Sequence, residues 1–502
     1  MMAKHKKKGF FAKLLSKRVL LFIQLIMSII FLAYIYILKM LPTKYYMILV
    51  GVIVLLFIMM NLFIRSGIKR KRKYGKGSRV VFSKLLCLII SVVLGYTSVM
   101  IAKGNSFLSN ITGSFLETRV ISIYAMNDSS IKSLDDLKGE TVGIQSERGT
   151  SSINNALSKA EDKLGSKIKT KDYKTYAKLG DALVDGKVKV IVVDQAYMSL
   201  LETHHDGLDE NLRSLFKVET KERINNVMKD TNVTKKPFIV YVTGIDTYGT
   251  VSTISRTDVN LLVCVSPVNH QILMVSIPRD TEVNLHKNGK MDKLTHSAMY
   301  GIDETISTIQ DFLELDVNYY AKTNFSGITN IIDALGGVTI DSPYNFTTMH
   351  GHYRINKGLN ELNGDQALCF VRERYALPRG DFDRGQNQQR LLKAMIKKAL
   401  SPQIITNYNN ILSAVEGCFE TNMASDDIKA LVNKQIDDGG SWQMFNVQVS
   451  GEGHKTTKTY SMPGQSVYTM VPDEKRLNRI IEVINKIEAD EKITKSDVKG
   501  LQ

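Results

Sequence analysis

Cysteine is scarce in this chain, which has four among its 502 residues. Cys87, Cys264 and Cys369 lie in apolar runs and Cys418 stands alone, so their spacing fits neither a disulfide framework nor a zinc site. A glycine-rich phosphate loop that ends in Gly-Lys-Ser or Gly-Lys-Thr is also missing. Ordinary nucleotide hydrolysis is therefore disfavoured.

Acidic residues are missing from residues 1–103, which contain nineteen lysines and arginines. The whole chain has a formal net charge of +16, so the remaining residues carry −3. The basic character therefore belongs to the N-terminal fifth of the chain. It does not indicate a face that binds nucleic acid.

Three runs in that N-terminal fifth contain no charged residue: residues 19–38, 45–64 and 85–102. Each has about the ~20 residues that a helix needs to cross a bilayer. A cleavable signal peptide would be single and shorter, and buried core helices would not come three in succession. We therefore expect three transmembrane helices and a membrane as a partner.

The basic residues around these runs predict their orientation. They are crowded in residues 4–18 and 65–84, whereas the link between the first and second runs holds only Lys39 and Lys44. Positively charged loops stay in the cytoplasm. We therefore expect a cytoplasmic N-terminus and place everything after Lys103 outside the cell, where few cysteines fit a bacterial surface.

The outer part divides into two α/β units. Residues 104–235 are expected to form a small accessory domain, because strand-like and helical runs alternate there. Those runs are the strands at 118–124 and 188–194, a short helix, turn and strand over 133–144, and a helix at 177–185. The polar, lysine-rich segment 217–236 is expected to link this unit to the next.

Residues 236–490 are expected to form a layered α-β-α domain with a mixed central sheet, followed by a tail at 491–502. Apolar runs predict buried strands at 238–242, 259–265 and 271–277. Helical spacing of apolar residues is found at 328–335, 391–400, 426–434 and 475–487. Gly336 and Gly337 come where the first of these helices should end.

Two arginines, Arg372 and Arg374, follow an apolar run at 366–371 that we interpret as a buried strand. Residues i and i+2 of a strand share a face, so both guanidinium groups would point the same way. That arrangement is unfavourable unless an anion lies between them, and two planar forks suit a pyrophosphate. The alternative is a solvated strand end, with one arginine paired to Glu373 or Asp381.

Further charged residues lie beside the ends of the predicted strands, where α/β folds place their sites. They are Asp246, Arg256, Asp258, Arg279, Asp280, Asp381 and Arg384. Carboxylates alone would also fit helix caps or turns. Together with the arginines they predict a site for Mg²⁺ and a polyphosphate, since Mg²⁺ takes one or two carboxylates and shares phosphate oxygens.

These residues form an ordered run of motifs that resembles the LytR-CpsA-Psr family over residues 236–490. The motifs are Gly244-x-Asp246, Arg256-x-Asp258, Ile277-Pro278-Arg279-Asp280, Lys293, Ala298-x-Tyr300-Gly301, Gly336-Gly337-Val338, Leu362-Asn363-Gly364-x-Gln366-Ala367, and Val371-Arg372-x-Arg374 with Asp381, Arg384 and Gln388. Three membrane spans and an added outer domain resemble the capsule-associated CpsA branch.

The resemblance implies a Gram-positive-type surface enzyme with the catalytic domain outside the cell. Such an enzyme transfers a glycopolymer, for example capsular polysaccharide, from a polyprenyl-pyrophosphate carrier to peptidoglycan and forms a phosphodiester. Capsule-synthesis proteins of the membrane are then candidate partners.

The resemblance also implies roles for single residues. Asp246 and Asp258 would bind Mg²⁺, and Asp381 would be the general base. The pyrophosphate would be held by Arg256, Arg279, Arg372, Arg374, Arg384 and Gln388. Asn387 departs from the family, because many relatives carry arginine there. The corresponding phosphate contact is therefore missing or comes from Arg379 or Arg390.

The residue types suit this chemistry on general grounds. Attack of a sugar hydroxyl on phosphorus needs charge stabilisation, which arginines and a metal supply, and a carboxylate takes the proton. The lipid tail needs an apolar groove. The helix at 328–335 is a candidate for lining it, and the alternative is plain core.

Two other functions remain open. The first is a membrane sensor that uses the 104–235 unit as a receptor, although its cytoplasmic loops are too short for a DNA-binding fold. The second is a scaffold that binds wall polymer without turning it over. A scaffold needs the arginines, but not Asp246, Asp258 and Asp381 together.

Overall fold

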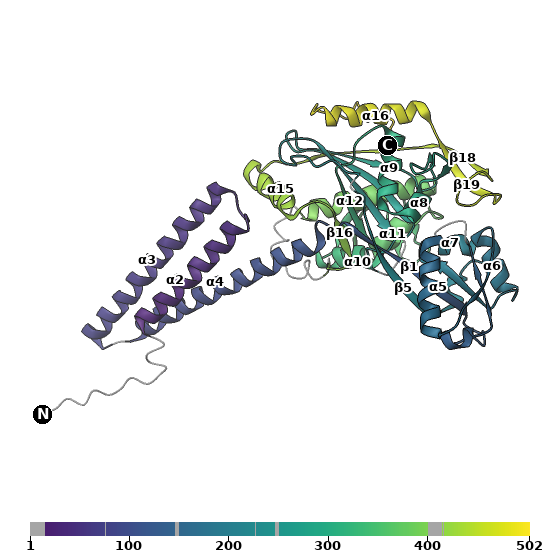
Figure 1. Cartoon of the computed structure of the whole chain (residues 1–502). Coiled ribbons are helices and arrows are strands. Elements are labelled where there is room, and N and C mark those ends of the chain that lie inside the picture. Colours follow the sequence, from purple (N-terminus) through teal and green to yellow (C-terminus); the bar gives the residue numbers. More distant parts are fainter. Residues whose placement is uncertain are drawn as a thin grey trace. The chain divides into compact units, whose positions relative to one another are not determined.

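The computed structural model describes residues 16–75, 77–145, 150–225, 227–245, 250–399, 414 and 416–502 (Figure 1). The chain divides into two compact units. One comprises Met1–Asn110 with Ala424–Gly440, and the other comprises Ile111–Met423 with Ser441–Gln502.

The first unit contains the long N-terminal helices α2 (Lys17–Ile37), α3 (Thr43–Tyr74) and α4 (Ser78–Ile111). Within the described residues, these three helices are long and apolar enough to cross a membrane, as the sequence predicts. Helix α15 (Ser425–Asp438) belongs to the same unit. The Asn433 side chain donates a hydrogen bond of 2.9 Å to the carbonyl of Lys39, at the turn between α2 and α3.

The second unit begins with a small α/β part. Its five-stranded sheet has the order β3-β2-β4-β1-β5. The strands are β1 (Leu116–Met126), β2 (Thr141–Ile144), β3 (Lys169–Asp172), β4 (Val190–Asp194) and β5 (Leu212–Arg223). The residues of helix α5 (Thr150–Leu164) share one apolar core with this sheet, and those of α6 (Tyr176–Val184) and α7 (Met198–Leu201) share another. The accessory α/β fold is therefore present.

The predicted linker at 217–236 is wrong in its first part, because Lys217 to Arg223 belong to β5. Among the described strands it pairs with β1 alone and so lies at the edge of the sheet, and its lysines stay in solvent while Val218 is buried. A one-sided edge strand is polar enough to be mistaken for a linker. Ile224, Met228 and Val233 are also buried beyond it.

The main sheet has six strands in the order β16-β11-β6-β7-β8-β17. They are β6 (Phe238–Ile245), β7 (Thr257–Ser266), β8 (Gln271–Ser276), β11 (Tyr319–Thr323), β16 (Phe419–Thr421) and β17 (Gln443–Gln448). Strand β6 is parallel to β11 and β8 is parallel to β17, whereas the other neighbours are antiparallel. The sheet is mixed, as expected.

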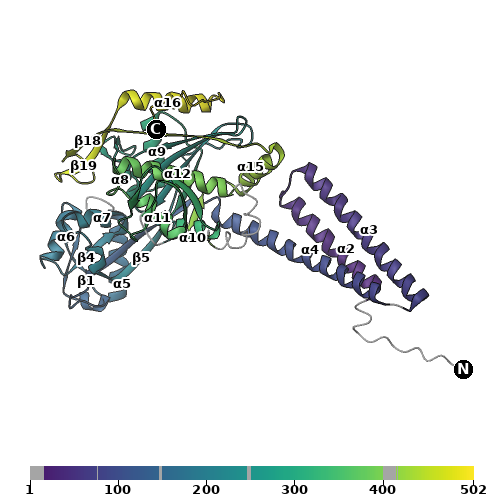
Figure 2. The same ribbon diagram turned by 180° about the vertical axis from the view of Figure 1, so that it is seen from behind.

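Helices cover both faces of this sheet (Figures 1 and 2). On one face lie α9 (Ile302–Leu313) and α16 (Glu474–Glu488), whose apolar residues share a core with Tyr241 and Leu262. On the other lie α10 (Phe325–Ala334), α11 (Gly364–Arg372) and α12 (Asp381–Ala399). Successive strand residues point to opposite faces, so Val242 and Leu261 are directed toward this second layer.

Smaller elements complete the domain. They are β9 (Glu282–Asn284), β10 (Met291–Lys293), α8 (Leu294–Ser297), β12 (Val338–Ser342), β13 (Phe346–Thr347), β14 (Arg354–Ile355), β15 (Gly358–Leu362), β18 (Gly451–Thr456) and β19 (Val467–Pro472). The architecture is thus the layered α-β-α domain that the sequence predicts.

A strand was predicted for the apolar run at 366–371. This prediction is wrong, because the run forms most of helix α11. The Asn363 side chain accepts from the backbone N–H of Gln366, and the Gln366 side chain accepts from that of Asn363. This reciprocal cap satisfies two N–H groups that the start of a helix leaves unpaired. The prediction at the preceding helix is confirmed, since Gly336 and Gly337 after α10 have φ values of +76° and +81°.

The segment 491–502 is not a free tail, contrary to expectation. Ile493, Val498 and Leu501 are buried in the main core, beside the apolar face of α16. The backbone N–H of Gln448 at the end of β17 donates to the carbonyl of Leu501 at 2.8 Å. The C-terminus is therefore part of the folded domain.

A buried ion pair joins the accessory part to the main sheet. Glu117 of β1 pairs with Lys322 of β11 at 2.7 Å, and its second oxygen accepts from the N–H of Ile302 at 2.8 Å. Two residues along β1, Arg119 pairs with Asp194 at 2.6 Å and with Glu222 at 2.7 Å. Glu117 thus ties β1 to the main sheet, whereas the Arg119 pairs hold β1 to β4 and β5 of its own sheet.

Replacing Lys322 by methionine should destabilise this junction strongly. The side chains of Lys322 and Glu117 are only 3% and 5% exposed, so the substitution leaves a buried carboxylate without its cation. Removing one partner of a buried pair costs roughly 3–5 kcal/mol. Thermal unfolding of the full-length protein in detergent measures the effect.

Lys229→Met is the matched control, because Lys229 pairs with Asp316 at 2.5 Å while both side chains are more than half exposed. Exposed pairs contribute about 0–1 kcal/mol. Equal shifts in the unfolding midpoint for Lys229→Met and Lys322→Met would contradict the importance of the buried pair.

Candidate active site

A cavity of about 420 Å³ lies between the main sheet and the layer formed by α10, α11 and α12. The end of β6, the start of β7 and the segment after β8 meet at one edge of the sheet, since these strands are antiparallel neighbours. The polar side chains that line the cavity include Arg256, Asp258, Arg279, Arg372, Arg374, Arg384 and Gln388. Those on the sheet side come from this edge, as the sequence predicts.

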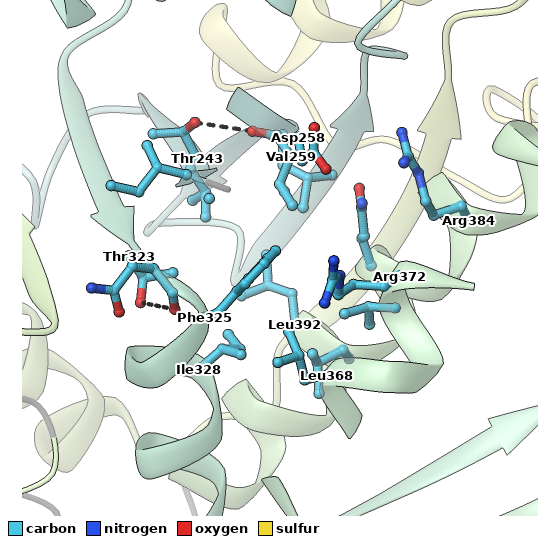
Figure 3. A pocket seen from close by; sticks show the side chains of 18 of the residues that line it. Thr243, Asp258, Val259, Thr323, Phe325, Ile328, Leu368, Arg372, Arg384 and Leu392 are labelled. Carbon is cyan, nitrogen blue, oxygen red and sulfur yellow. Dashed lines mark hydrogen bonds between the residues drawn. The ribbon is translucent and has the colours of Figure 1, made fainter. Parts of the chain in front are cut away.

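The other part of the lining is apolar. It includes Val242, Ile245, Val259, Leu261, Phe325, Ile328, Ile331, Met349, Leu368, Val371, Leu391, Leu392, Met395 and Phe419. In Figure 3, Asp258 and Arg384 lie toward the upper end of the pocket, and Ile328 and Leu368 lie toward the lower end. One cavity therefore joins a cationic end to an apolar end.

Asp258 and Arg279 form the centre of the charged end. The Arg279 guanidinium donates to Asp258 at 2.6 Å, and both side chains are 19% exposed. Burial raises the pKa of the Asp258 carboxyl, but Arg279, Arg384 and Arg256 outweigh it and lower that pKa to about 2. Asp258 is therefore ionised at neutral pH, and it is a poor proton acceptor.

Asp280 supports this centre from behind. It pairs with Lys293 at 2.9 Å, and one of its oxygens lies 3.7 Å from the Arg279 guanidinium. Burial raises the pKa of the Asp280 carboxyl, but Lys293 and Arg279 lower it by a larger amount, so the net shift is downward. Burial alone would lower the pKa of Arg279, but Asp258 and Asp280 raise it on balance. Asp280 thus positions Arg279 and is outside the cavity lining.

Arg384 is buried among other cations. Burial lowers the pKa of its guanidinium, and Arg279 adds to that shift, although Asp381 opposes it. The oxygen of Asp381 lies 2.6 Å from the guanidinium, one turn earlier in α12. A buried cation whose charge is disfavoured in this way is stabilised by an added anion.

Aromatic rings hold the two arginines at the end of α11. The Arg372 guanidinium lies 4.2 Å from the centre of the Phe325 ring, and that of Arg374 lies 4.5 Å from the Tyr375 ring. Arg374 also donates to the Tyr375 hydroxyl. Stacking on an aromatic face orients a guanidinium while leaving its N–H edge available.

The alternative of a solvated pair at Arg372 and Arg374 does not match the observed partners of the acids. The Glu373 carboxylate accepts from the backbone N–H groups of Met349, Arg374 and Ala376 at 2.5–3.0 Å. Asp381 pairs with Arg384 instead. Both arginines line the cavity from the helix end, although the strand expected for them is absent.

Two of the candidate residues need separate mention. Asp246 lies outside the described residues. Asp381, the expected general base, is the first residue of α12 and reaches the site through its pair with Arg384. The remaining candidates share the cavity: Arg256, Asp258, Arg279, Arg372, Arg374, Arg384 and Gln388.

Neither arginine expected to compensate for Asn387 lines this cavity. The Arg379 guanidinium donates to Asp383 at 2.6 and 2.9 Å, and Arg390 donates to Asn387 at 2.8 Å. Asn387 itself is buried, at 2% exposure. Asn387 thus accepts a hydrogen bond from Arg390, and neither residue lines the cavity with Arg384 and Gln388.

The helix predicted at 328–335 contributes both to the cavity lining and to the core. Ile328 and Ile331 line the cavity, whereas Ile332 and Leu335 are buried. Phe325 and the apolar residues of α12 that line the cavity, Leu391, Leu392 and Met395, were not among the predicted site residues. Arg384, Gln388, Leu391 and Met395 recur every three or four residues, and that spacing could have indicated a single face of one helix.

The charged end fits a divalent cation in part. Within the described residues, no group of three or more His, Cys, Asp or Glu side chains is placed to hold a metal by itself. Asp258 supplies one ionised carboxylate in the lining, and Mg²⁺ is commonly bound by one or two carboxylates together with substrate phosphates.

The site and fold together define an α-β-α domain with an arginine-rich anion site opening into an apolar cavity. A sequence model of the LytR_cpsA_psr family matches residues 207–479. Because that match covers more than half of the chain, the chain belongs to the LytR-CpsA-Psr family. The match begins before residue 236 and therefore includes part of the accessory sheet.

Individual relatives are similar over about half of the chain. The polyisoprenyl-teichoic acid–peptidoglycan teichoic acid transferase TagU of Bacillus cereus is 30% identical over 256 residues, which cover 50% of this chain and 81% of that protein. TagU of Enterococcus faecalis is 34% identical over 216 residues, covering 42% and 70%. The crystal structure of B. subtilis TagV matches 52% of this chain and 99% of that chain at 28% identity, with a TM-score of 0.44.

Proposed function

We propose that this protein is a membrane-anchored phosphotransferase that moves a glycopolymer from a polyprenyl-pyrophosphate carrier to peptidoglycan. The observation that carries the proposal is the single cavity with five arginines at one end and apolar side chains at the other. A carrier of this kind also has two parts, a doubly charged diphosphate and a long hydrocarbon tail. Relatives named as teichoic acid–peptidoglycan transferases support the same reaction class.

Charge complementarity supports the assignment of the diphosphate to the cationic end. Five arginines line the cavity, together with the carboxylates of Asp258 and Glu373. The lining therefore carries a net positive charge, whereas each phosphate of the diphosphate carries a negative charge. Planar guanidinium groups bind phosphate oxygens in bidentate fashion. Gln388 would donate to an oxygen of the same head group.

The reaction we propose is an in-line transfer. A hydroxyl of peptidoglycan attacks the phosphorus that carries the polymer, and the bond to the bridging oxygen of the diphosphate breaks. Polyprenyl phosphate leaves, and the polymer remains on peptidoglycan through a phosphodiester. The arginines stabilise charge that develops on the phosphate oxygens and on the leaving group.

Asp381 is the residue we propose to accept the proton of the attacking hydroxyl. Asp258 is unsuitable, because its pKa is about 2. Glu373 is occupied by three backbone N–H groups. Asp381 pairs with Arg384 at 2.6 Å, and its side chain is 29% exposed, so an incoming hydroxyl can reach it.

We further propose that Asp258 and Asp246 hold Mg²⁺ together with the diphosphate. The ion would neutralise phosphate charge and polarise the phosphoryl oxygens. The ionised state of Asp258 supports this role. Its ion pair with Arg279 fixes the carboxylate orientation.

The proposed setting is the outer face of a bacterial membrane, with the N-terminus in the cytoplasm. The three apolar helices and the charge distribution of residues 1–103 support it. The added accessory part, joined to the main sheet by the Glu117–Lys322 pair, supports a capsule-associated role like that of the CpsA branch. Capsular polysaccharide is then the proposed polymer, and capsule-synthesis membrane proteins are the proposed partners.

A reconstituted assay tests the function and the metal together. Full-length protein in detergent is mixed with a polyprenyl-pyrophosphate-linked oligosaccharide and peptidoglycan fragments, and release of polyprenyl phosphate is measured. We expect release to fall at least about tenfold with a chelator and to recover with Mg²⁺. Release that is unaffected by the chelator would contradict the proposed role of Mg²⁺.

Binding of the carrier without any release in Mg²⁺ would contradict the transferase and leave a scaffold or a sensor. Asp381→Asn separates these cases further. If Asp381 is the base, this variant retains carrier binding but loses transfer.

A further inference from the structure

A second cavity, of about 1180 Å³, lies on another side of helix α12. Its walls come from α12, from β12 and β15, from β17, and from the C-terminal segment. The cationic side chains that line it are Arg390, Lys393, Lys397, Lys398 and Lys495. We call this cavity the basic groove.

Helix α12 therefore has two lined faces. Arg384, Gln388, Leu391 and Met395 line the first cavity, and Gln386, Arg390, Lys393 and Lys397 line the basic groove. Each set recurs every three or four residues, which places each set on one side of an α-helix. With a rise of 1.5 Å per residue, Arg390 to Lys397 span roughly 10 Å along the groove.

The positive charge of the groove is not balanced within its lining. Asp341 is the only acidic residue among the described lining residues, against five cations. The Arg390 guanidinium donates to two neutral amides, Asn387 at 2.8 Å and Gln386 at 3.1 Å. Burial lowers the pKa of the Lys393 ammonium, and Lys397 lowers it further. The groove thus concentrates cations that an anion would stabilise.

The rest of the lining mixes amides and one hydroxyl with apolar side chains. Thr339, Gln386, Asn446 and Gln502 provide polar groups between the cations, and Phe445 provides an aromatic surface. Regular cations mixed with amides match a chain that alternates anionic groups with hydroxyls. A flat membrane surface would instead be met by lysines that protrude, whereas these line a concave groove.

We propose that the basic groove binds an anionic glycan, a sugar or polyol chain with a phosphate or carboxylate in each repeat. This inference rests on the proposed function, because the glycan would be the polymer that the first cavity holds by its diphosphate. It restricts the substrate class to polymers whose repeats are negatively charged. A neutral polymer would gain nothing from the groove.

Binding of defined oligomers to the full-length protein in detergent tests the proposal. The probes are an oligomer of glycerol phosphate, an oligomer of a uronic acid and a neutral oligosaccharide of equal length. We expect Lys393→Gln/Lys397→Gln to weaken binding of an anionic oligomer about tenfold and to reduce its salt dependence. Binding of the neutral oligosaccharide should not change. The two anionic probes distinguish a phosphate from a carboxylate preference.

The matched control is Lys159→Gln/Lys163→Gln, which removes two exposed lysines at the same spacing from helix α5. Equal binding by this control and by Lys393→Gln/Lys397→Gln would overturn the proposal. The proposal would also be overturned if Lys393→Gln/Lys397→Gln lost binding to vesicles of anionic lipid while its oligomer binding stayed unchanged. Either result would assign the lysines to something other than a glycan.

Failure of the proposed function is separately visible in Arg372→Ala. This variant should keep oligomer binding in the basic groove while losing transfer. Oligomer binding that is lost in Arg372→Ala and retained in Lys393→Gln/Lys397→Gln would place the glycan in the first cavity and overturn the assignment of the groove.

Discussion

Replacing Arg372 by alanine is expected to slow transfer of polymer by about 10²–10³-fold, the usual cost of removing one preorganised donor from a site of developing charge. Arg372 lines the cationic end of the cavity, and its guanidinium stacks on Phe325 at 4.2 Å. Arg374→Ala should have a similar effect, and the double variant should lose more. The measurement is polymer covalently attached to peptidoglycan in cells that lack any related transferase, together with release of polyprenyl phosphate by purified protein.

The substitution should leave the fold intact. Arg372 is the last residue of α11, so its replacement removes no core side chain. Arg354→Ala, an exposed arginine of β14 in the same domain, is the control and should transfer normally. Normal attachment by Arg372→Ala/Arg374→Ala would rule out the assigned site. Arg372→Lys should recover little, because an ammonium cannot reproduce a bidentate planar contact.

Filling the apolar end should remove the lipid. Ile331 lines the cavity from α10 and is only partly buried, so Ile331→Trp places a larger side chain into about 420 Å³ of space. Excluding one isoprene unit of five carbons removes roughly 3–4 kcal/mol of apolar burial, which is about 10²–10³-fold in affinity. Mass spectrometry of lipid that co-purifies with the full-length protein measures the loss.

Val184→Trp is the control for added bulk, since Val184 is 43% exposed at the end of α6, remote from the cavity. Ile331→Trp should unfold at nearly the same temperature as the unmodified protein, because the added ring enters empty space. Undiminished lipid in a folded Ile331→Trp protein would show that the tail lies elsewhere.

The central strands and the position of the site were predictable for one physical reason. Residues 238–242, 259–265 and 271–277 are apolar without alternation, as strands covered on both faces must be. Arg256, Asp258 and Arg279 flank such runs, so antiparallel pairing of β7 with β8 brings them to one edge. That inference needs no knowledge of the helices.

The run at 366–371 shows where local pattern was insufficient. Six mainly apolar residues fit a short strand or two turns of helix equally well. The Asn363 and Gln366 cap distinguishes a helix from a strand here, because Asn followed three residues later by Gln is typical of a helix start. The same limit applies to 491–502, where Ile493, Val498 and Leu501 are isolated apolar residues whose burial depends on α16 and β17.

The contact of Arg372 with Phe325 is of a different kind. The two residues are far apart in sequence and come from the facing ends of α11 and α10. No spacing rule connects them, because only tertiary packing brings them together. The two faces of α12 were predictable in part. Helical periodicity shows which residues share a face, but it does not show which cavity each face lines.

The two lined faces of α12 impose an unusual restriction on how this helix can change. Each residue turns an α-helix by about 100°, so a single insertion after Gln388 would carry Lys393 and Lys397 away from their own side and toward that of Leu391 and Met395. Substitutions can retune either side independently, but insertions and deletions alter both at once. Length variation among natural variants should therefore be found in the connections around α12 and be rare within it.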